Sequence, residues 1–293
     1  MNKFSVFIDG EFLFFTFKSM GIQEKDIDWH AFHGLIRNKI ENYTNARPMV
    51  GRIHIFKAES VAFFPVKRNE WFNNKLKNDI KEYKVYDADN RLITDYASLT
   101  EDDIEKIRLR AVTDLKDFKE KYMSGVLGRY RHITINNAFI ELSLPGFVKY
   151  DPIIGRPIEE KGVDVGIATD MILKSDNYDV AIILSGDADL TPAIKQIKNK
   201  MKFVFLLRVF KEKPPRPVGI SDQLSQLVDG YIDFPLCEIP FSFRISCDTC
   251  ANTINVDNYF LSDINFLSRE DVRLTHTCKC GQILDFNRTV FEN

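Results

Sequence analysis

The chain has 293 residues, a formal net charge of −2, an apolar fraction of 44% and a charged fraction of 28%. The length suffices for one large domain or two smaller ones, and the composition is ordinary for a folded soluble protein. The balanced charge excludes a basic field over the whole molecule, so any nucleic acid must be held by local patches. No run approaches the roughly 18–20 apolar residues of a membrane span. Asp9 and Glu11 interrupt the apolar N-terminus, which excludes a signal peptide. We therefore expect a cytoplasmic protein without a membrane partner.

The first half of the chain predicts a mixture of strands and helices. In chain order these are a strand at 3–8, a helix from 28, a strand at 51–58, a helix at 70–83, a short strand at 84–88, a helix at 100–123, and one or two strands at 131–142. The helix at 100–123 has the clearest amphipathic pattern, with apolar residues stepping by three and four. Thr100 and Asp103 at its start resemble a capping box.

The second half alternates regularly after a polar, proline-containing loop at 151–160. The expected elements are a helix at 164–174, a strand at 179–184, a helix at 190–200, a strand at 202–210, a short helix at 221–229 and a strand at 231–234. Such alternation predicts an α/β domain with a mainly parallel sheet, closing near residue 236. The continuous apolar run "VAIIL" is typical of a strand covered on both faces.

Four aspartates are expected at one rim of this sheet. Asp9 ends the first strand, Asp187 and Asp189 follow the strand at 179–184, and Asp164 starts a helix. Ligands of open parallel sheets bind at the carboxyl ends of the strands. Clustered carboxylates repel one another, and a divalent cation such as Mg²⁺ or Mn²⁺ removes that penalty. The acids therefore indicate a metal site.

Each aspartate also has a purely structural interpretation. Asp189 and Asp164 are each placed to cap the helix that follows, Asp187 suits a turn after Gly186, and Asp9 suits a turn at the end of its strand. Aspartate favours such positions for backbone reasons alone. Composition and spacing leave the two interpretations open.

The order of three motifs resembles the NYN domains of the PIN-like nuclease superfamily. The motifs are "FSVFIDGE" at the N-terminus, "KGVDVGIATDMI" in the middle, and "DVAIILSGDADLTPAI" with "SDQLSQLVDGYIDF" near the end. The resemblance covers about 3–66 and 147–234, so that 67–146 looks like an insertion. It implies a Rossmann-like, three-layer fold and a Mg²⁺- or Mn²⁺-dependent endoribonuclease. RNA would be the substrate, and a protein partner or homodimer is a further expectation.

The resemblance assigns the acidic site residue by residue. Asp9, Asp164, Asp187 and Asp189 would hold the metal, Ser185 would hold a ligand or water beside them, and Lys161 would face a phosphate. Many family members have an asparagine where this chain has Phe12, which cannot ligate a metal. Glu11 is either a replacement carboxylate or a solvated residue at a helix start. A non-catalytic module that binds RNA or protein is the alternative function.

Two other enzyme classes fit less well. A phosphatase of the haloacid-dehalogenase type needs a second aspartate where this chain has Glu11. A dinucleotide enzyme needs a Gly-x-Gly-x-x-Gly turn, which does not open a helix after any expected strand.

A basic strip follows the acidic motif along the chain. Its members are Lys195, Lys198, Lys202, Arg208, Lys211 and Lys213. Clustered lysine and arginine with little offsetting acid is the usual footprint of phosphate contact. A solvated helix face with an ordinary loop explains the same pattern.

The five cysteines all lie in the last fifth of the chain, which excludes a disulfide framework for the whole protein. Cys247 and Cys250 form one pair, and Cys278 and Cys280 form another. Two such pairs predict a structural zinc site in a ribbon-like module at 237–293. His276 is a substitute for Cys278, Cys237 is expected to be a bystander, and free cytosolic thiols are the simpler alternative.

Overall fold

The structure is a computed structural model. It describes residues 3–19, 24–48, 50–63, 69–87, 89–210, 220–235, 238–239, 242–246, 253–257, 274–277, 280 and 283–286. The chain divides into two units. The first unit contains Met1–Phe56, Ile133–Leu142 and Ile167–Asn293, and the second contains Lys57–His132 and Ser143–Gly166.

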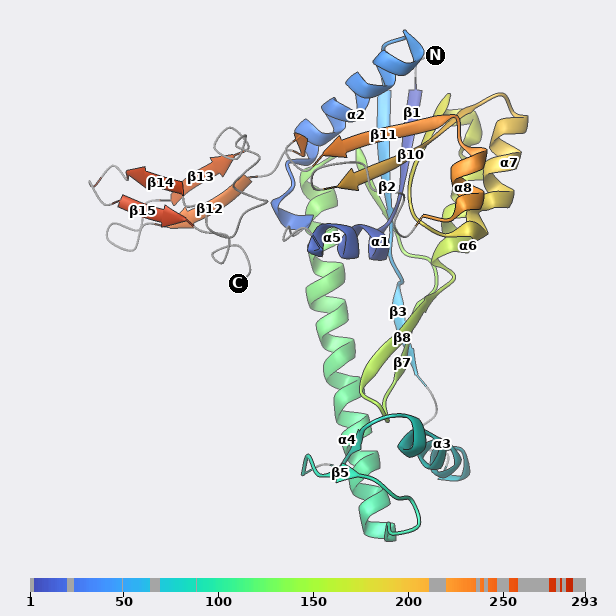
Figure 1. The fold of residues 1–293 in the computed structure, drawn as a ribbon, viewed down its shortest axis with the longest axis vertical. Helices are drawn as coiled ribbons and strands as arrows, with labels where there is room; N and C mark the ends of the chain where they lie inside the picture. The colour runs from blue at the N-terminus through green and yellow to red at the C-terminus, as the bar shows by residue number, and fades with distance from the viewer. Residues whose placement is uncertain are drawn as a thin grey trace. The chain divides into compact units, whose positions relative to one another are not determined.

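The first unit is built on a six-stranded sheet with the strand order β11-β10-β9-β1-β2-β6 (Figure 1). Its strands are β1 (Lys3–Asp9), β2 (Val50–Phe56), β6 (Ile140–Ser143), β9 (Val180–Leu184), β10 (Phe203–Phe210) and β11 (Gly230–Pro235). The pairs β1–β2, β1–β9, β9–β10 and β10–β11 are all parallel. This confirms the predicted α/β class with a mainly parallel, Rossmann-like sheet.

Helices flank this sheet, as its parallel connections require. They are α1 (Gly10–Lys18), α2 (Trp29–Thr44), α6 (Val163–Leu173), α7 (Thr191–Asn199) and α8 (Asp222–Leu227). On β1 successive side chains point to opposite faces. Phe4 contacts His33 of α2, whereas Phe7 packs edge-on against Tyr178. All five residues of β9 are buried, as predicted for a strand covered on both sides.

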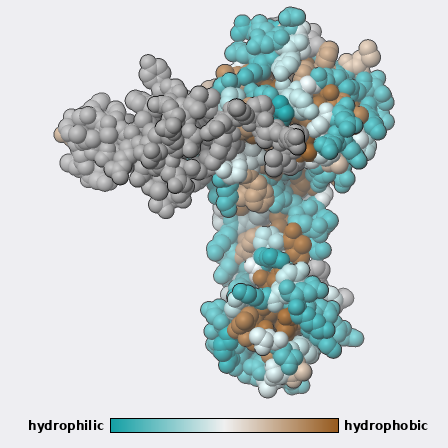
Figure 2. Space-filling view, viewed as in Figure 1, coloured by the Kyte–Doolittle hydropathy of each residue, from teal (hydrophilic) through white to brown (hydrophobic). Residues whose placement is uncertain are grey.

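The second unit has a small sheet and its own apolar core. The sheet has the order β3-β7-β8, from β3 (Ser60–Phe63), β7 (Phe147–Asp151) and β8 (Arg156–Lys161). The helices are α3 (Asn69–Glu82), α4 (Glu101–Glu120), a π-helical turn at Lys121–Val126 and α5 (Leu127–Asn136), and β4 (Val85–Tyr86) pairs with β5 (Leu92–Ile93). Phe72, Leu76, Ile107 and Ala111 are fully buried between α3 and α4. Figure 2 shows hydrophobic side chains reaching the visible surface of the molecule among hydrophilic ones.

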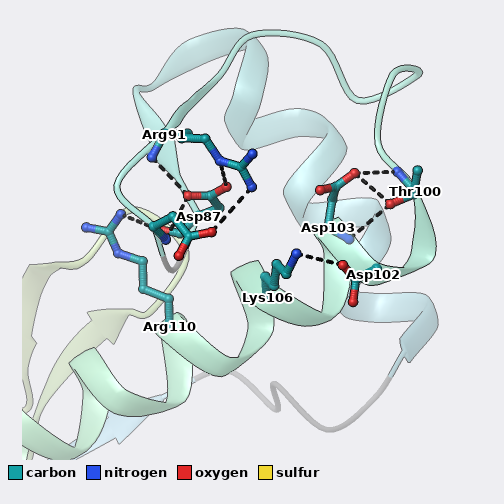
Figure 3. Close-up of polar contacts among 8 residues, drawn as sticks. Asp87, Arg91, Thr100, Asp102, Asp103, Lys106 and Arg110 are labelled. Carbon is teal, nitrogen blue, oxygen red and sulfur yellow. Dashed lines mark hydrogen bonds and ion pairs between the residues drawn. The ribbon is translucent and has the colours of Figure 1, made fainter.

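The start of α4 shows how local sequence sets an element boundary in this unit. Thr100 Oγ1 accepts from the Asp103 backbone N–H at 3.2 Å, and Asp103 Oδ2 accepts from Thr100 N at 3.0 Å (Figure 3). The predicted capping box is therefore confirmed. In the preceding loop the buried Asp87 carboxylate accepts from Arg91 Nε at 2.8 Å, and Arg110 of α4 donates to the Asp87 carbonyl at 3.0 Å. These bonds hold the loop against the helix.

Two predicted elements are wrong. The strands expected at 131–142 are mostly helix, because α5 continues to Asn136 and only β6 (Ile140–Ser143) is extended. Burial of Leu127, Tyr130 and Ile133 follows a helical three-residue spacing. The loop expected at 151–160 contains the strand β8, which pairs antiparallel with β7. Polar residues and Pro157 conceal this strand in the sequence.

The C-terminal part contains two antiparallel pairs. One consists of β12 (Ser242–Ser246) and β13 (Thr253–Asp257), and the other of β14 (Leu274–Thr277) and β15 (Ile283–Phe286). Within the described part of the chain, no helix combines the length and the apolar character needed to cross a bilayer.

Candidate active site

The strand order of the first unit contains one point where the connections reverse direction. From β1 the chain goes to β2 on one side, and from β9 it goes to β10 on the other side. In doubly wound sheets such a reversal leaves a crevice at the carboxyl ends of the two central strands. The candidate site is therefore the end of β1 and β9, where Asp9 and Ser185 leave the sheet.

Asp9 is held by the first turn of α1. It is the N-cap of this helix, and its Oδ1 accepts from Glu11 N at 2.8 Å and from Phe12 N at 3.1 Å. These bonds satisfy two of the amides that a helix start leaves without partners. They also fix the orientation of the carboxylate at the end of β1.

The loop after β9 is ordered by the side chains of the "SGDAD" motif. Ser185 is 1% exposed, and its Oγ accepts from Asp187 N at 3.2 Å. Asp187 Oδ1 accepts from Asp189 N at 2.8 Å and caps a 3-10 turn at Ala188–Leu190. Asp187 Oδ2 has no hydrogen-bond partner among the described residues. Asp187 is thus the capping aspartate, whereas the exposed Asp189 lies inside the turn and α7 starts after Leu190.

Parallel register brings the two motifs together. Ile8 pairs with Leu184, so Asp9 and Ser185 occupy the next position on neighbouring strands. Ser221 N donates to the Gly186 carbonyl at 3.1 Å and ties this loop to the start of α8. Asp9, Ser185 and Asp187 therefore place oxygen atoms that can ligate a metal at one edge of the sheet.

The donor set suits a hard divalent cation. Across the ranges that the structure describes, no group of three or more His, Cys, Asp or Glu side chains is placed to hold a metal ion. Mg²⁺, however, is usually bound by one or two carboxylates, with water and substrate phosphate completing its shell. Two aspartates and a serine hydroxyl at one sheet edge fit that pattern of oxygen ligands.

Lys161 and Asp164 belong to the second unit, at the junction of β8 and α6. Lys161 Nζ pairs with Glu159 Oε2 at 2.7 Å, and Asp164 lies in the first turn of α6 and is not its cap. Gly162 between them has φ +83°, a conformation that favours glycine. A Cβ on the adjoining Gly146 would lie 1.8 Å from the Lys161 carbonyl oxygen. Both glycines are therefore required by this turn.

Residues 11 and 12 have clear structural roles. Glu11 lies in the first turn of α1, as expected for an acid at a helix start. Phe12 is half-buried and contributes its backbone N–H to the Asp9 cap.

Most of the described basic strip has internal partners. Lys198 Nζ lies 2.7 Å from Asp229 Oδ1, and Lys202 Nζ lies 3.8 Å from Asp179 Oδ1. Arg208 makes two 2.7 Å hydrogen bonds to the Asp233 carboxylate and stacks over the Tyr231 ring. Lys195 is exposed on α7, and Lys211 and Lys213 lie outside the described residues.

The cysteine pairs fall largely outside the described residues. Cys247, Cys250, Cys278 and Cys237 are not among them, and neither is the side chain of His276. Cys280 is described and is exposed.

A buried ion pair that lies in the second unit was not predicted from the sequence. Lys57 Nζ lies 2.6 Å from Glu160 Oε1, and the two side chains are only 6% and 9% exposed. Glu160 Oε2 is buried without a hydrogen-bond partner among the described residues. Lys57 directly follows Phe56, the register partner of Asp9. A charged residue directly after a buried strand is the sequence signal that points to Lys57.

Comparison with known proteins identifies one family. The NYN domain matches residues 87–237, a little over half of the chain. No curated protein matches. A solved structure of a Vibrio parahaemolyticus protein of unknown function is similar at 15% identity with a TM-score of 0.39, covering 81% of this chain and 95% of the other. The matched segment includes Lys161, Asp164, Ser185, Asp187 and Asp189, whereas Asp9 precedes it.

Proposed function

The chain belongs to the NYN domain family, and on that premise we propose that it is a divalent-metal-dependent endoribonuclease. NYN domains are a PIN-like nuclease family, so the match supports a nuclease. The observation that carries the proposal is the register of β1 and β9, which makes Asp9 and Ser185 neighbours where the sheet reverses direction. RNA is the proposed substrate.

The proposed metal ligands are Asp9, Asp164, Asp187 and Asp189, with Ser185 holding a ligand or water beside them. Bound Mg²⁺ or Mn²⁺ would supply an activated water and neutralise charge on the phosphate. The chain's own part is to hold the carboxylates in place. The Asp9 and Asp187 side chains each have one oxygen fixed by backbone amides, which limits their rotation. Lys161 would add a positive charge toward the phosphate.

The basic strip is proposed as the RNA surface, with Lys195 as its main described contact. Lys198, Lys202 and Arg208 already face carboxylates, so each would have to share its charge with RNA. Lys211 and Lys213 are included in the proposed RNA surface because of their positions in the sequence. A partner protein or homodimer and a cytoplasmic location also remain proposals.

A structural Zn²⁺ held by Cys247, Cys250, Cys278 and Cys280 is proposed for the module at 237–293. In the sequence, the first cysteine pair falls between β12 and β13, and the second falls between β14 and β15. Zinc knuckles place two thiolates in the connection of an antiparallel pair, so the strand positions support this ligand set.

A substrate panel tests the proposed function. The full chain would be incubated with labelled single-stranded RNA, single-stranded DNA and a phosphomonoester, each with Mn²⁺, Mg²⁺ or EDTA. We expect cleavage of RNA that EDTA blocks. Phosphate release from the monoester without RNA cleavage would overturn the nuclease.

A non-catalytic RNA- or protein-binding module is the second candidate. It is favoured by Phe12 at the position of the family asparagine and by the small number of clustered acids in the described residues. RNA binding without cleavage in any metal would select this alternative.

A further inference from the structure

A pocket lies in the first unit, at the opposite end of β1 from Asp9. It has a volume of about 340 Å³, within the usual range of small-molecule sites. Its polar lining comes from Ser5, Arg52, His54, Glu141, Lys174 and Asn177. Ser5 and Arg52 are register partners in the amino-terminal halves of β1 and β2. The pocket therefore lies at the amino edge of the sheet, away from the candidate active site at the carboxyl edge.

Two cationic side chains of the pocket lining, Arg52 and Lys174, contact Glu141. Arg52 Nη1 donates to Glu141 Oε1 at 2.9 Å, and Lys174 Nζ lies 3.4 Å from Glu141 Oε2. Lys174 also pairs with Asp170 at 2.8 Å. Lys3 adds a further positive residue to the lining. Glu141 is the only acid among the lining residues, so the pocket carries more positive than negative charge.

Two polar residues of the lining are largely buried. Ser5 is 6% exposed and His54 is 2% exposed. Both residues line the pocket. A molecule bound in the pocket would meet polar groups that are largely shielded from water, where hydrogen bonds are stronger.

His54 lies beside the Glu141 and Lys174 side chains. Its Nδ1 lies 3.1 Å from Glu141 Oε2 and 3.3 Å from Lys174 Nζ, so it either donates to the first or accepts from the second. Burial and the Lys174 charge lower the pKa of His54 to about 4, which keeps the ring neutral at pH 7. When Nδ1 accepts from Lys174, the proton resides on Nε2.

We propose that this pocket binds a small phosphorylated ligand of about mononucleotide size. The phosphate would accept from the Ser5 hydroxyl, the Arg52 guanidinium and the Asn177 amide, and arginine is well suited to phosphate oxygens. Val50, which precedes Arg52 on the same face of β2 and is exposed, would lie against the rest of the ligand. The site does not depend on the nuclease proposal, because none of its residues is a proposed metal ligand.

Binding measured by isothermal titration calorimetry on the full chain tests the proposal, with AMP, inorganic phosphate and adenosine as probes. We expect AMP and phosphate to bind and adenosine not to bind. Arg52→Gln and Ser5→Ala should each weaken AMP binding, Arg52→Gln by at least about tenfold, the effect of losing one charge-assisted hydrogen bond. Glu141→Gln should strengthen it, because the internal carboxylate no longer competes for Arg52 and Lys174.

Arg47→Gln is the matched control, because Arg47 precedes the same strand, is 63% exposed and does not line the pocket. It should leave AMP binding unchanged, as should Asp187→Asn at the other edge. Circular dichroism would verify the fold of each variant. Failure of folded wild-type protein to bind AMP and phosphate would overturn the proposal, as would equal effects of Arg52→Gln and Arg47→Gln. Adenosine binding as tightly as AMP would also overturn it.

Discussion

Ile8 of β1 and Leu184 of β9 are register partners in a parallel pair. Asp9 and Ser185 follow them directly and are therefore neighbours where the two strands end. The register arises because both strands are apolar and buried in the centre of the sheet. A shift by one residue would exchange the faces of every side chain on β1. The apolar pattern of the two strands therefore determines that Asp9 and the motif starting at Ser185 lie at the same position along neighbouring strands.

Asp9 serves both as a helix cap and as a proposed metal ligand, and two substitutions separate these roles. Asp9→Asn retains an oxygen acceptor for Glu11 N and Phe12 N, so stability should change little. Asp9→Ala removes the cap and should cost about 1 kcal/mol. Both variants should lose RNA cleavage, because neither has a carboxylate. Urea unfolding and a cleavage assay check this, and full activity of Asp9→Asn would remove Asp9 from the proposed site.

Arg208 is expected to stabilise the sheet more than it binds RNA. Its side chain is 15% exposed, and its guanidinium donates two hydrogen bonds to Asp233 on the neighbouring strand β11. Arg208→Gln should cost about 1.5–3 kcal/mol in unfolding free energy, the range for hydrogen bonds to charged groups. Lys195→Gln should weaken RNA binding with little effect on stability. Fluorescence anisotropy and urea unfolding compare the two, and the reverse pattern would contradict this division.

The His54 environment predicts a pH dependence of stability. The folded-state pKa of about 4 lies below the ordinary value of 6.5. Between these values the unfolded chain binds more protons, so stability should fall as pH decreases from 6.5 toward 4. The loss attributable to His54 is at most roughly 3 kcal/mol. His54→Gln should flatten this part of the profile of unfolding free energy against pH. If the slope of unfolding free energy against pH were the same in His54→Gln and the wild type, other groups would cause the pH dependence.

The proposed zinc site predicts one bound zinc per chain. Inductively coupled plasma mass spectrometry of the purified protein should detect this zinc, and Cys250→Ser should lower the zinc content. Cys237→Ser is the matched control, because Cys237 lies outside both cysteine pairs. Equal zinc content in the wild type and Cys250→Ser would contradict this ligand set.

Local sequence patterns predicted much of the sheet. The run at 180–184 is fully buried as expected, and Thr100 with Asp103 forms the predicted capping box. The error at 131–142 has a physical origin, since Ile133, Thr134 and Ile135 favour strands when considered alone. In the folded chain they continue a helical segment that begins at Glu101.

The site was predictable only in part. The positions of Asp9 and Asp187 after apolar strands indicated the carboxyl edge, and register brings the two motifs together. Partners of the basic strip were not predictable, because Asp179, Asp229 and Asp233 lie far from them along the chain. Charge clustering along the sequence does not show which charges are already paired in space.

Cleavage of labelled single-stranded RNA by Asp187→Asn, compared with the wild type in Mn²⁺ and in EDTA, tests the nuclease assignment most directly. Asparagine can still cap the turn at Asp189, so the fold should persist. Asp176→Asn is the matched control, because Asp176 is 87% exposed and precedes β9, whereas Asp187 follows the same strand. We expect wild-type and Asp176→Asn cleavage that EDTA abolishes, and a loss on the order of 100-fold in Asp187→Asn. Retention of metal-dependent cleavage by folded Asp187→Asn would contradict the proposed active site.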